Sequence, residues 1–151
     1  KKSYAQNGQI LFTIGYEGKS IEEFINTLIQ NDVHLLCDVR KNPLSRKFGF
    51  SKKKLEQISQ TVGIEYVHVP ELGIDSNKRS SLKTAKDYQC LFEDYAKTLP
   101  TRMEYLDKVY TLLQIKNRIA IMCFELEPQN CHRHVIRDYL VKSYQIRSQD
   151  L

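Results

Sequence analysis

The sequence predicts a single α/β domain: a mostly parallel sheet of four or five strands with helices on both faces, Rossmann-like in class. Short apolar segments alternate with segments of helical periodicity along almost the whole chain. Most of the short segments are continuously apolar, which is typical of strands buried on both faces. At 151 residues and 41% hydrophobic, the chain is long enough for one substantial core. We expect residues 1–151 to form one domain, with residues 1–8 a loose N-terminal extension.

The first strand and helix are predicted from clear start and stop signals in the sequence. Residues 9–14 (QILFTI) form an apolar, β-rich segment that ends at Gly15. Ser20 and Glu23 have the spacing of a capping box, and apolar residues follow at helical intervals. The next apolar segment, residues 34–39, predicts a second strand.

The middle of the chain predicts a basic helix, a strand and a long loop. Ser51 is the candidate cap of the helix, and Gly63 ends it. Residues 64–69 predict a third strand. Residues 71–83 have no periodicity, and a loop of that length inside a compact domain is usually functional or mobile, so it is a candidate lid.

The C-terminal third predicts three helices and one or two strands. Two helical segments lie on either side of Pro100. Residues 118–123 (RIAIMC) predict the fourth strand, and residues 130 to about 142 predict the last helix. Residues 144–147 are a candidate fifth strand.

Composition narrows the class of protein. No apolar segment reaches membrane-spanning length, and the N-terminal residues lack the apolar region of a secretory signal. Cys37 falls in a predicted strand and Cys90 in a predicted helix, so we expect all four cysteines to be free thiols in a reducing cytoplasm. The net charge of +5 permits an acidic partner without establishing one. The densest basic cluster comprises Arg46, Lys47, Lys52, Lys53 and Lys54.

The most informative segment is residues 123–133, which read CFELEPQNCHR. A strand ends at Cys123 and Glu125, and Asn130 is expected to open the last helix. A thiol, an imidazole and a guanidinium would then lie on the first helical turn, where the helix dipole lowers thiol pKa values and attracts anions. Those three residues are Cys131, His132 and Arg133.

The polar residues that follow the strands should meet at one edge, because ligands of an open parallel sheet bind beyond the carboxyl ends of its strands. We expect four catalytic residues. Cys131 would be the nucleophile or a positioning group, its thiolate favoured by a protonated His132, and Asp38 or Glu125 would move protons. The expected ligand-binding residues are Gly15, Tyr16, Arg40, Ser45, His68, Cys123 and Arg133. Structural alternatives remain open: Asp38 and Glu125 can instead pair with the arginines, and the cysteines and His68 can be core residues.

Metal binding is a weaker interpretation of the same residues. Cys123, Cys131 and His132 with one further ligand could hold zinc, but the chain has no C-x2-C pair. The turn from Gly15 to Gly18 is not G-x-G-x-x-G, so a dinucleotide is not indicated. The sequence therefore predicts no metal site and no cofactor.

Several spaced motifs resemble the "domain of unknown function 488" family from about residue 10 to the end of the last helix. They are Thr13-Ile14-Gly15-Tyr16, Asp38-Val39-Arg40 with Pro43 and Ser45, Tyr66-x-His68-x-Pro70-x-Leu72-Gly73, and Cys123-x-Glu125 with Cys131-His132-Arg133. The chain has Tyr16 where a histidine is frequent in the family, and Ile74 where a second glycine is usual. The resemblance implies a small cytosolic α/β domain whose polar rim is the site, and it implies no particular reaction.

Three functions are compatible with this pattern. The first is a small cytoplasmic enzyme acting on an anionic ligand, such as a nucleotide or a nucleic-acid component. The second is a non-catalytic nucleic-acid-binding or regulatory module, suggested by the basic segment 46–54. The third is a thiol redox protein that uses Cys123 and Cys131. None of the three involves a membrane, and the oligomeric state is left open.

Overall fold

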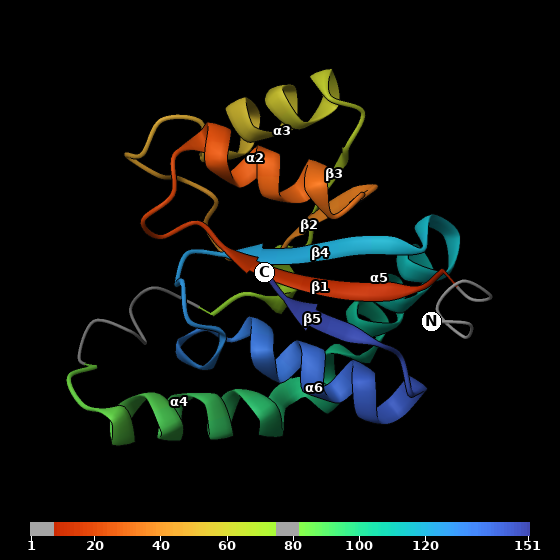
Figure 1. Ribbon diagram of the computed structural model, residues 1–151. Helices are drawn as coiled ribbons and strands as arrows, with labels where there is room; N and C mark the ends of the chain where they lie inside the picture. Colours follow the sequence, from red (N-terminus) through yellow and green to blue (C-terminus); the bar gives the residue numbers. More distant parts are fainter. Residues whose placement is uncertain (1–7, 75–81) are drawn as a thin grey trace.

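The protein has a five-stranded parallel sheet between two layers of helices, as a computed structural model of residues 8–74 and 82–151 shows (Figure 1). The strand order is β3-β2-β4-β1-β5, and each neighbouring pair is parallel. The strands are β1 (Ile10–Gly15), β2 (Leu35–Asp38), β3 (Glu65–His68), β4 (Arg118–Cys123) and β5 (Ser148–Asp150). This architecture confirms the predicted fold class.

Five α-helices cover the two faces of the sheet. In Figure 1, one face carries α2 (Ile21–Gln30) and α3 (Lys52–Thr61). The other face carries α4 (Ala85–Thr98), α5 (Met103–Lys116) and α6 (Arg133–Tyr144). Three short 3-10 turns complete the described elements: η1 (Pro70–Leu72), η3 (Leu99–Arg102) and η4 (Pro128–Asn130).

Two hydrophobic cores lie on the two faces of the sheet because neighbouring strand residues point to opposite sides. In β1, Leu11 packs toward α4, α5 and α6, whereas Phe12 packs toward α2 and α3. The strands are buried on both sides as a result, and every residue of β1 is less than 9% exposed. This explains why the sequence shows continuous apolar segments.

The predicted helix starts are confirmed in part. Ser20 and Glu23 form the expected capping box of α2. Ser51 is the N-cap of α3, but its hydroxyl donates to the Ser45 carbonyl at 3.0 Å instead of capping the helix. Thr84 forms a second capping box with Asp87 at the start of α4.

Two boundaries near the C-terminus were predicted wrongly. The last helix begins at Arg133 and not at Asn130, because residues 128–130 form the separate turn η4. The fifth strand is Ser148–Asp150 and not residues 144–147, which are the end of α6 and a connection. The predicted N-terminal extension (residues 1–8) and candidate lid (residues 71–83) fall largely on residues 1–7 and 75–81, outside the described part.

The strand order creates a crevice between β1 and β4. These neighbours end side by side, with Gly15 paired to Cys123. The chain then leaves β1 toward α2 on one face and leaves β4 toward α6 on the other (Figure 1). Such a divergence is the position at which open α/β sheets bind ligands.

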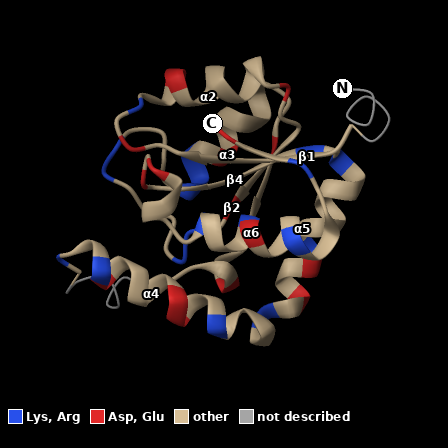
Figure 2. Ribbon diagram, turned by 60° about the horizontal axis from the view of Figure 1, so that its bottom comes forward, with Lys and Arg blue, Asp and Glu red and all other residues tan. Residues whose placement is uncertain are grey.

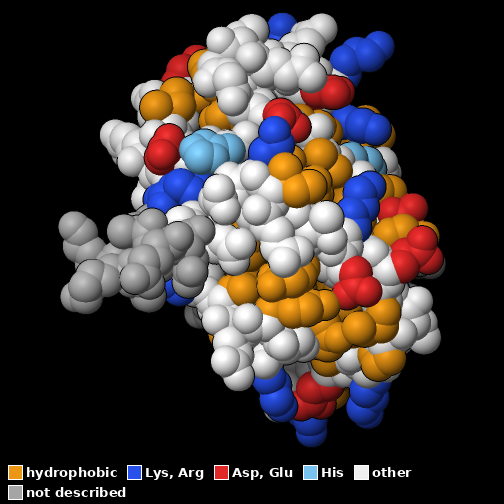
Figure 3. Space-filling view, turned by 90° about the vertical axis from the view of Figure 1, so that its right-hand side faces the viewer, with side chains coloured by type: hydrophobic (Ala, Val, Ile, Leu, Met, Phe, Trp, Pro, Cys, Tyr) orange, Lys and Arg blue, Asp and Glu red, His pale blue; other side chains and the backbone are white. Residues whose placement is uncertain are grey.

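The opposite end of the sheet, where the strands begin, is packed differently. Figure 3 views the molecule from that side, and hydrophobic side chains gather in its lower half, where Figure 1 places α4, α5 and α6. Within this layer, Tyr110 of α5 stacks on Tyr144 of α6 with ring centroids 3.7 Å apart. Among the described residues, no helix is both long enough and apolar enough to cross a membrane.

Replacing Gly15 with alanine should destabilise the fold by about 3 kcal/mol, because the new methyl group overlaps neighbouring backbone. A Cβ at this position would lie 1.7 Å from the Glu125 carbonyl oxygen. Gly18→Ala is the matched control: Gly18 has a φ of +77° but open space around it, so only backbone strain of about 1 kcal/mol is expected. Urea denaturation measures the free energy of unfolding of both variants. Equal losses of stability in Gly15→Ala and Gly18→Ala would refute the close approach of Gly15 to the Glu125 backbone.

Candidate functional site

The loops that follow β1 and β4 are bonded to each other at the crevice. The Tyr16 amide donates to the Cys123 carbonyl at 3.3 Å, and the Glu17 amide donates to the Phe124 carbonyl at 2.8 Å. The Leu126 amide in turn donates to the Glu17 carboxylate at 3.0 Å. These bonds extend the β1–β4 pairing beyond the strands and fix the position of residues 123–126.

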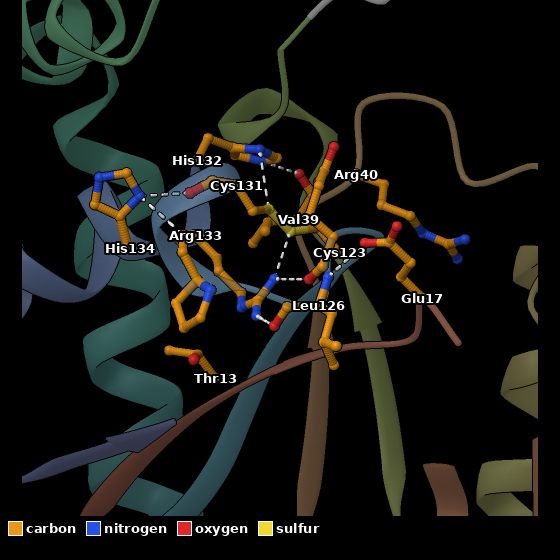
Figure 4. The surroundings of a disulfide bond; sticks show 12 residues. Thr13, Glu17, Val39, Arg40, Cys123, Leu126, Cys131, His132, Arg133 and His134 are labelled. Carbon is orange, nitrogen blue, oxygen red and sulfur yellow. Dashed lines mark hydrogen bonds between the residues drawn. A yellow bond between two sulfur atoms is a disulfide. The ribbon is translucent and has the colours of Figure 1, made fainter. Parts of the chain in front are cut away.

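Arg133, the first residue of α6, donates hydrogen bonds to the backbone of the loop that follows β4. Its side chain is fully buried, and Nη1 donates to the Glu125 carbonyl at 2.6 Å while Nη2 donates to the Leu126 carbonyl at 3.0 Å (Figure 4). Nη1 also lies 3.3 Å from the Cys123 sulfur. Burial lowers the pKa of Arg133 to about 10, although the charges of Asp150 and Glu125 oppose that shift.

Cys123 and Cys131 form a disulfide, with Cα atoms 7.1 Å apart. This corrects the expectation of four free thiols, because strand and helix patterns do not reveal that the two loops bring these sulfurs together. Cys131 is fully buried and Cys123 is 1% exposed. The remaining pair, Cys37 and Cys90, are free thiols.

The two free thiols differ in their surroundings. Cys37 is completely buried in β2, and this burial raises its pKa to about 12. Cys90 is exposed on α4. Neither belongs to the crevice between β1 and β4, so Cys90 is a convenient control for chemistry at the disulfide.

His132 lies between the disulfide and the end of β2. Its Nε2 is 2.9 Å from the Val39 carbonyl, a bond in which the ring nitrogen donates, and its Nδ1 is 3.7 Å from the Cys131 sulfur. The ring is 2% exposed and packs edge-on against Tyr95. His132 is the residue that precedes α6, so it does not lie on the first helical turn as predicted.

Asp38 and Arg40 form a buried ion pair. The Asp38 carboxylate accepts from Arg40 Nε at 2.9 Å, from Nη2 at 2.7 Å and from the Tyr66 hydroxyl at 2.5 Å. Arg40 Nη1 donates to the Tyr16 hydroxyl at 3.2 Å and to the Phe50 carbonyl at 2.7 Å. Burial alone would lower the pKa of Arg40, but the hydrogen bonds and charge of Asp38 outweigh it and raise that pKa. Burial and the charge of Asp38 both raise the pKa of Tyr66.

A cavity of about 190 Å³ opens at the crevice. Its polar lining includes Arg40, Lys41 and Asn42, and Cys123 and His132 line it as well. The complete lining is Tyr16, Arg40, Lys41, Asn42, Leu44, Ile74, Cys123, Phe124 and His132. The cavity therefore brings a cysteine sulfur and an imidazole next to the basic segment that follows β2.

Not every expected residue reaches this cavity. Gly15, Asp38, Glu125, Cys131 and Arg133 lie around it but do not line it. Figure 4 shows the Arg133 guanidinium directed toward Cys123, whereas the Arg40 guanidinium is directed away from the disulfide. The two arginines therefore do not converge on one ligand.

Ser45 and His68 do not line the cavity either, and both form hydrogen bonds within the fold. The Ser45 hydroxyl accepts from the Lys47 amide at 3.1 Å. His68 Nε2 lies 2.8 Å from the Arg40 carbonyl. Sequence reasoning missed Lys41 and Asn42, which also line the cavity, because their spacing matches no ligand-binding motif.

Residues 20–140 match the family model described as "Domain of unknown function DUF488". The chain belongs to the DUF488 family. No curated protein and no solved structure matches it significantly. The matched region contains β2, β3, β4 and the whole segment 123–133, so the disulfide and every residue that lines the cavity except Tyr16 lie in the part of the molecule that the DUF488 model describes.

Positive charge surrounds this edge of the DUF488 fold. Figure 2 shows Lys and Arg on the loops at its left-hand side, where the strands end. Lys19 Nζ donates to the Gly15 carbonyl at 3.2 Å, and Lys47 Nζ donates to the Tyr16 carbonyl at 3.1 Å. Burial and the charge of Arg133 lower the pKa of Lys19, although Glu23 opposes them.

Asp38→Asn should destabilise the DUF488 fold by about 3–5 kcal/mol, because it leaves the buried Arg40 charge uncompensated. Tyr66→Phe removes one hydrogen bond to a carboxylate and should cost about 1.5–3 kcal/mol. The control is Glu65→Gln, which removes an exposed ion pair with Lys116 and should cost less than about 1 kcal/mol. Urea denaturation measures all three variants. If Asp38→Asn lost no more stability than the Glu65→Gln control, the Asp38–Arg40 ion pair would not stabilise the fold as described.

Proposed function

We propose that the protein is an enzyme that acts on a small anionic disulfide or thiol by thiol–disulfide exchange. The observation that carries this proposal is a disulfide of which one cysteine, Cys123, lines a cavity that Arg40, Lys41 and Asn42 also line. The proposal combines the expected anionic ligand with the expected redox use of Cys123 and Cys131.

Cys123 is the reacting thiol in this proposal because it lines the cavity and Cys131 does not. Arg133 Nη1, 3.3 Å from the Cys123 sulfur, is positioned to stabilise a thiolate by its charge and its hydrogen bond. The role of nucleophile therefore moves from Cys131, where the sequence pattern put it, to Cys123. Cys131 becomes the second thiol that resolves the intermediate.

The exchange takes place in two balanced steps. The Cys123 thiolate attacks one sulfur of a substrate disulfide, forming a mixed disulfide and releasing one substrate thiolate. The Cys131 thiolate then attacks the Cys123 sulfur, which closes the protein disulfide and releases the second substrate thiolate. Two electrons pass from the protein to the substrate, and His132 Nδ1, which faces the Cys131 sulfur, accepts the proton of that thiol.

Asp38 and Glu125 have no proton-transfer step in this scheme. The Asp38 carboxylate is committed to Arg40 and Tyr66. Glu125 contributes its backbone carbonyl to Arg133, and its carboxylate acts on Arg133 electrostatically. Both residues support the site by holding an arginine in place.

Reduced Cys131→Ser protein should accumulate a mixed disulfide at Cys123 when it is incubated with dithiodiglycolate, because the second step is blocked. Attachment should be slower with the neutral analogue bis(2-hydroxyethyl) disulfide, and Lys41→Ala should reduce that difference. Mass spectrometry of the intact and digested protein identifies the adduct and its rate.

Cys90→Ser is the matched control, since Cys90 is an exposed thiol outside the cavity, and it should leave the adduct unchanged. Urea denaturation of each variant separates loss of reaction from loss of fold. An adduct that forms only on Cys90, or equal rates for the charged and neutral disulfides, would refute the proposal.

One surface favours a second candidate function, binding of single-stranded nucleic acid. Phe48 is 69% exposed, and Lys54 Nζ lies 5.6 Å from the centroid of its ring. Phe48 and Lys54 belong to the basic segment 46–54, which also contains Arg46, Lys47, Lys52 and Lys53. Exposed aromatic rings among cations are the elements that single-stranded nucleic-acid sites use for stacking and phosphate contact.

Phe48→Ala should weaken binding of a single-stranded oligonucleotide, with a loss of about 1–3 kcal/mol for one stacked base. Binding of the parent protein should fall steeply as salt is raised. Ile115→Ala removes a similarly exposed hydrophobic side chain on α5 and serves as the control. Fluorescence anisotropy measures the affinities, and salt-independent binding or an equal loss in the control would exclude this function.

A further inference from the structure

The disulfide and its neighbouring imidazole form a cluster with the composition of a metal site. The Cys123 sulfur, the Cys131 sulfur and a ring nitrogen of His132 all lie within 4.8 Å of one another, and all three residues are buried. We propose that, once the disulfide is reduced, these three residues bind one zinc ion with a fourth coordination position open to the cavity. This proposal goes beyond the exchange reaction and revises the expectation of no metal site.

The ligand types favour zinc over the hard cations. Two thiolates and one imidazole suit Zn²⁺, whereas Mg²⁺ and Ca²⁺ prefer oxygen ligands. The two thiolates neutralise the charge of the ion. A tetrahedral zinc ion would hold the sulfurs about 3.8 Å apart, given Zn–S bonds of about 2.3 Å.

The surroundings of the cluster orient its ligands. His132 Nε2 bonds to the Val39 carbonyl, which directs Nδ1 toward the sulfurs. Metal-binding histidines characteristically donate their other ring N–H to a carbonyl or carboxylate in this way. Arg133 Nη1 supplies a hydrogen bond to the Cys123 sulfur, the kind of outer contact that stabilises a metal-bound thiolate.

Three protein ligands are the number found in zinc sites that keep one position for water or substrate. Cys123 and His132 line the cavity, whereas Cys131 does not. With two of its three ligands at the cavity, the ion would have its fourth position on the side that Arg40 and Lys41 also line. A water molecule or a small anion entering the cavity would complete the coordination.

Zinc and the disulfide exclude each other because both use the same two sulfurs. A substrate disulfide that oxidises the zinc-bound thiolates would yield the protein disulfide, two substrate thiolates and a free Zn²⁺ ion. The electrons and charges balance, since two electrons pass to the substrate and the metal leaves without a change of oxidation state. The site would thus bind metal only in its reduced form.

The test uses the reduced protein, freed of metal and titrated with Co²⁺ as a spectroscopic probe for zinc. One equivalent should bind, with sulfur-to-cobalt charge-transfer absorption and the visible bands of a four-coordinate ion, and Zn²⁺ should displace it. Cys131→Ser and His132→Gln should each weaken binding at least tenfold, while Cys90→Ser should have no effect. Oxidation to the disulfide should release the metal.

The inference is overturned if the reduced protein gives no charge-transfer absorption, if that absorption persists in Cys131→Ser, or if it depends on Cys90. Circular dichroism of each variant without metal shows whether the fold is intact. The dithiodiglycolate reaction, run with a chelator present, reports on Cys123 without metal. If Cys123 reacts with dithiodiglycolate but the protein binds no Co²⁺, the proposed exchange function stands and the proposed zinc site is wrong.

Discussion

The buried guanidinium of Arg133 is the interaction on which the candidate site depends. It joins the start of α6 to the backbone of residues 125 and 126 and to the Cys123 sulfur. This arrangement is possible only because Gly15 has no side chain, since a Cβ there would meet both the Glu125 carbonyl and Arg133. The approach of these segments holds Cys123 and Cys131 next to each other.

A second buried charge defines the opposite wall of the crevice. The Asp38–Arg40 pair joins the end of β2 to Tyr66 of β3, to Tyr16 after β1 and to the Phe50 carbonyl. A buried pair of this kind is costly to desolvate, and its geometry and its additional hydrogen bonds offset that cost. The two arginines therefore stabilise different parts of the site: Arg40 the end of β2 and its neighbours, and Arg133 the loop after β4. Residues from both parts line the cavity.

Much of the fold could be predicted from the sequence because its signals are local. Continuous apolar segments indicated the buried strands, and the spacing of Ser20 and Glu23 indicated the start of α2. The start of α6 was misplaced because Pro128 and Asn130 form a 3-10 turn of their own, and the helix begins three residues later. The parallel topology correctly indicated that polar residues after each strand would share one edge.

The roles within the site were harder to predict because they depend on contacts between distant segments. The pairing of Arg40 with Asp38 is supported by the Phe50 carbonyl, which accepts from Arg40, and by the Tyr66 hydroxyl, which donates to Asp38. Both supporting residues are distant in the sequence, so no local pattern indicates them. The pairing of Cys123 with Cys131 depends on the close approach at Gly15. Lys41 and Asn42 reach the cavity through the course of the loop after β2, and their spacing alone gives no sign of it.

The central claim is that the Cys123–Cys131 pair exchanges reversibly while the fold persists in both states. The most direct measurement is a redox titration of the purified protein in thiol–disulfide buffers, with the oxidised fraction read by mass spectrometry and the fold by circular dichroism. The account expects a single reversible two-electron transition between about −300 and −120 mV, the range of exchange-active disulfides, with an unchanged spectrum. A pair that stays oxidised throughout that range, or that unfolds the protein when reduced, would contradict it.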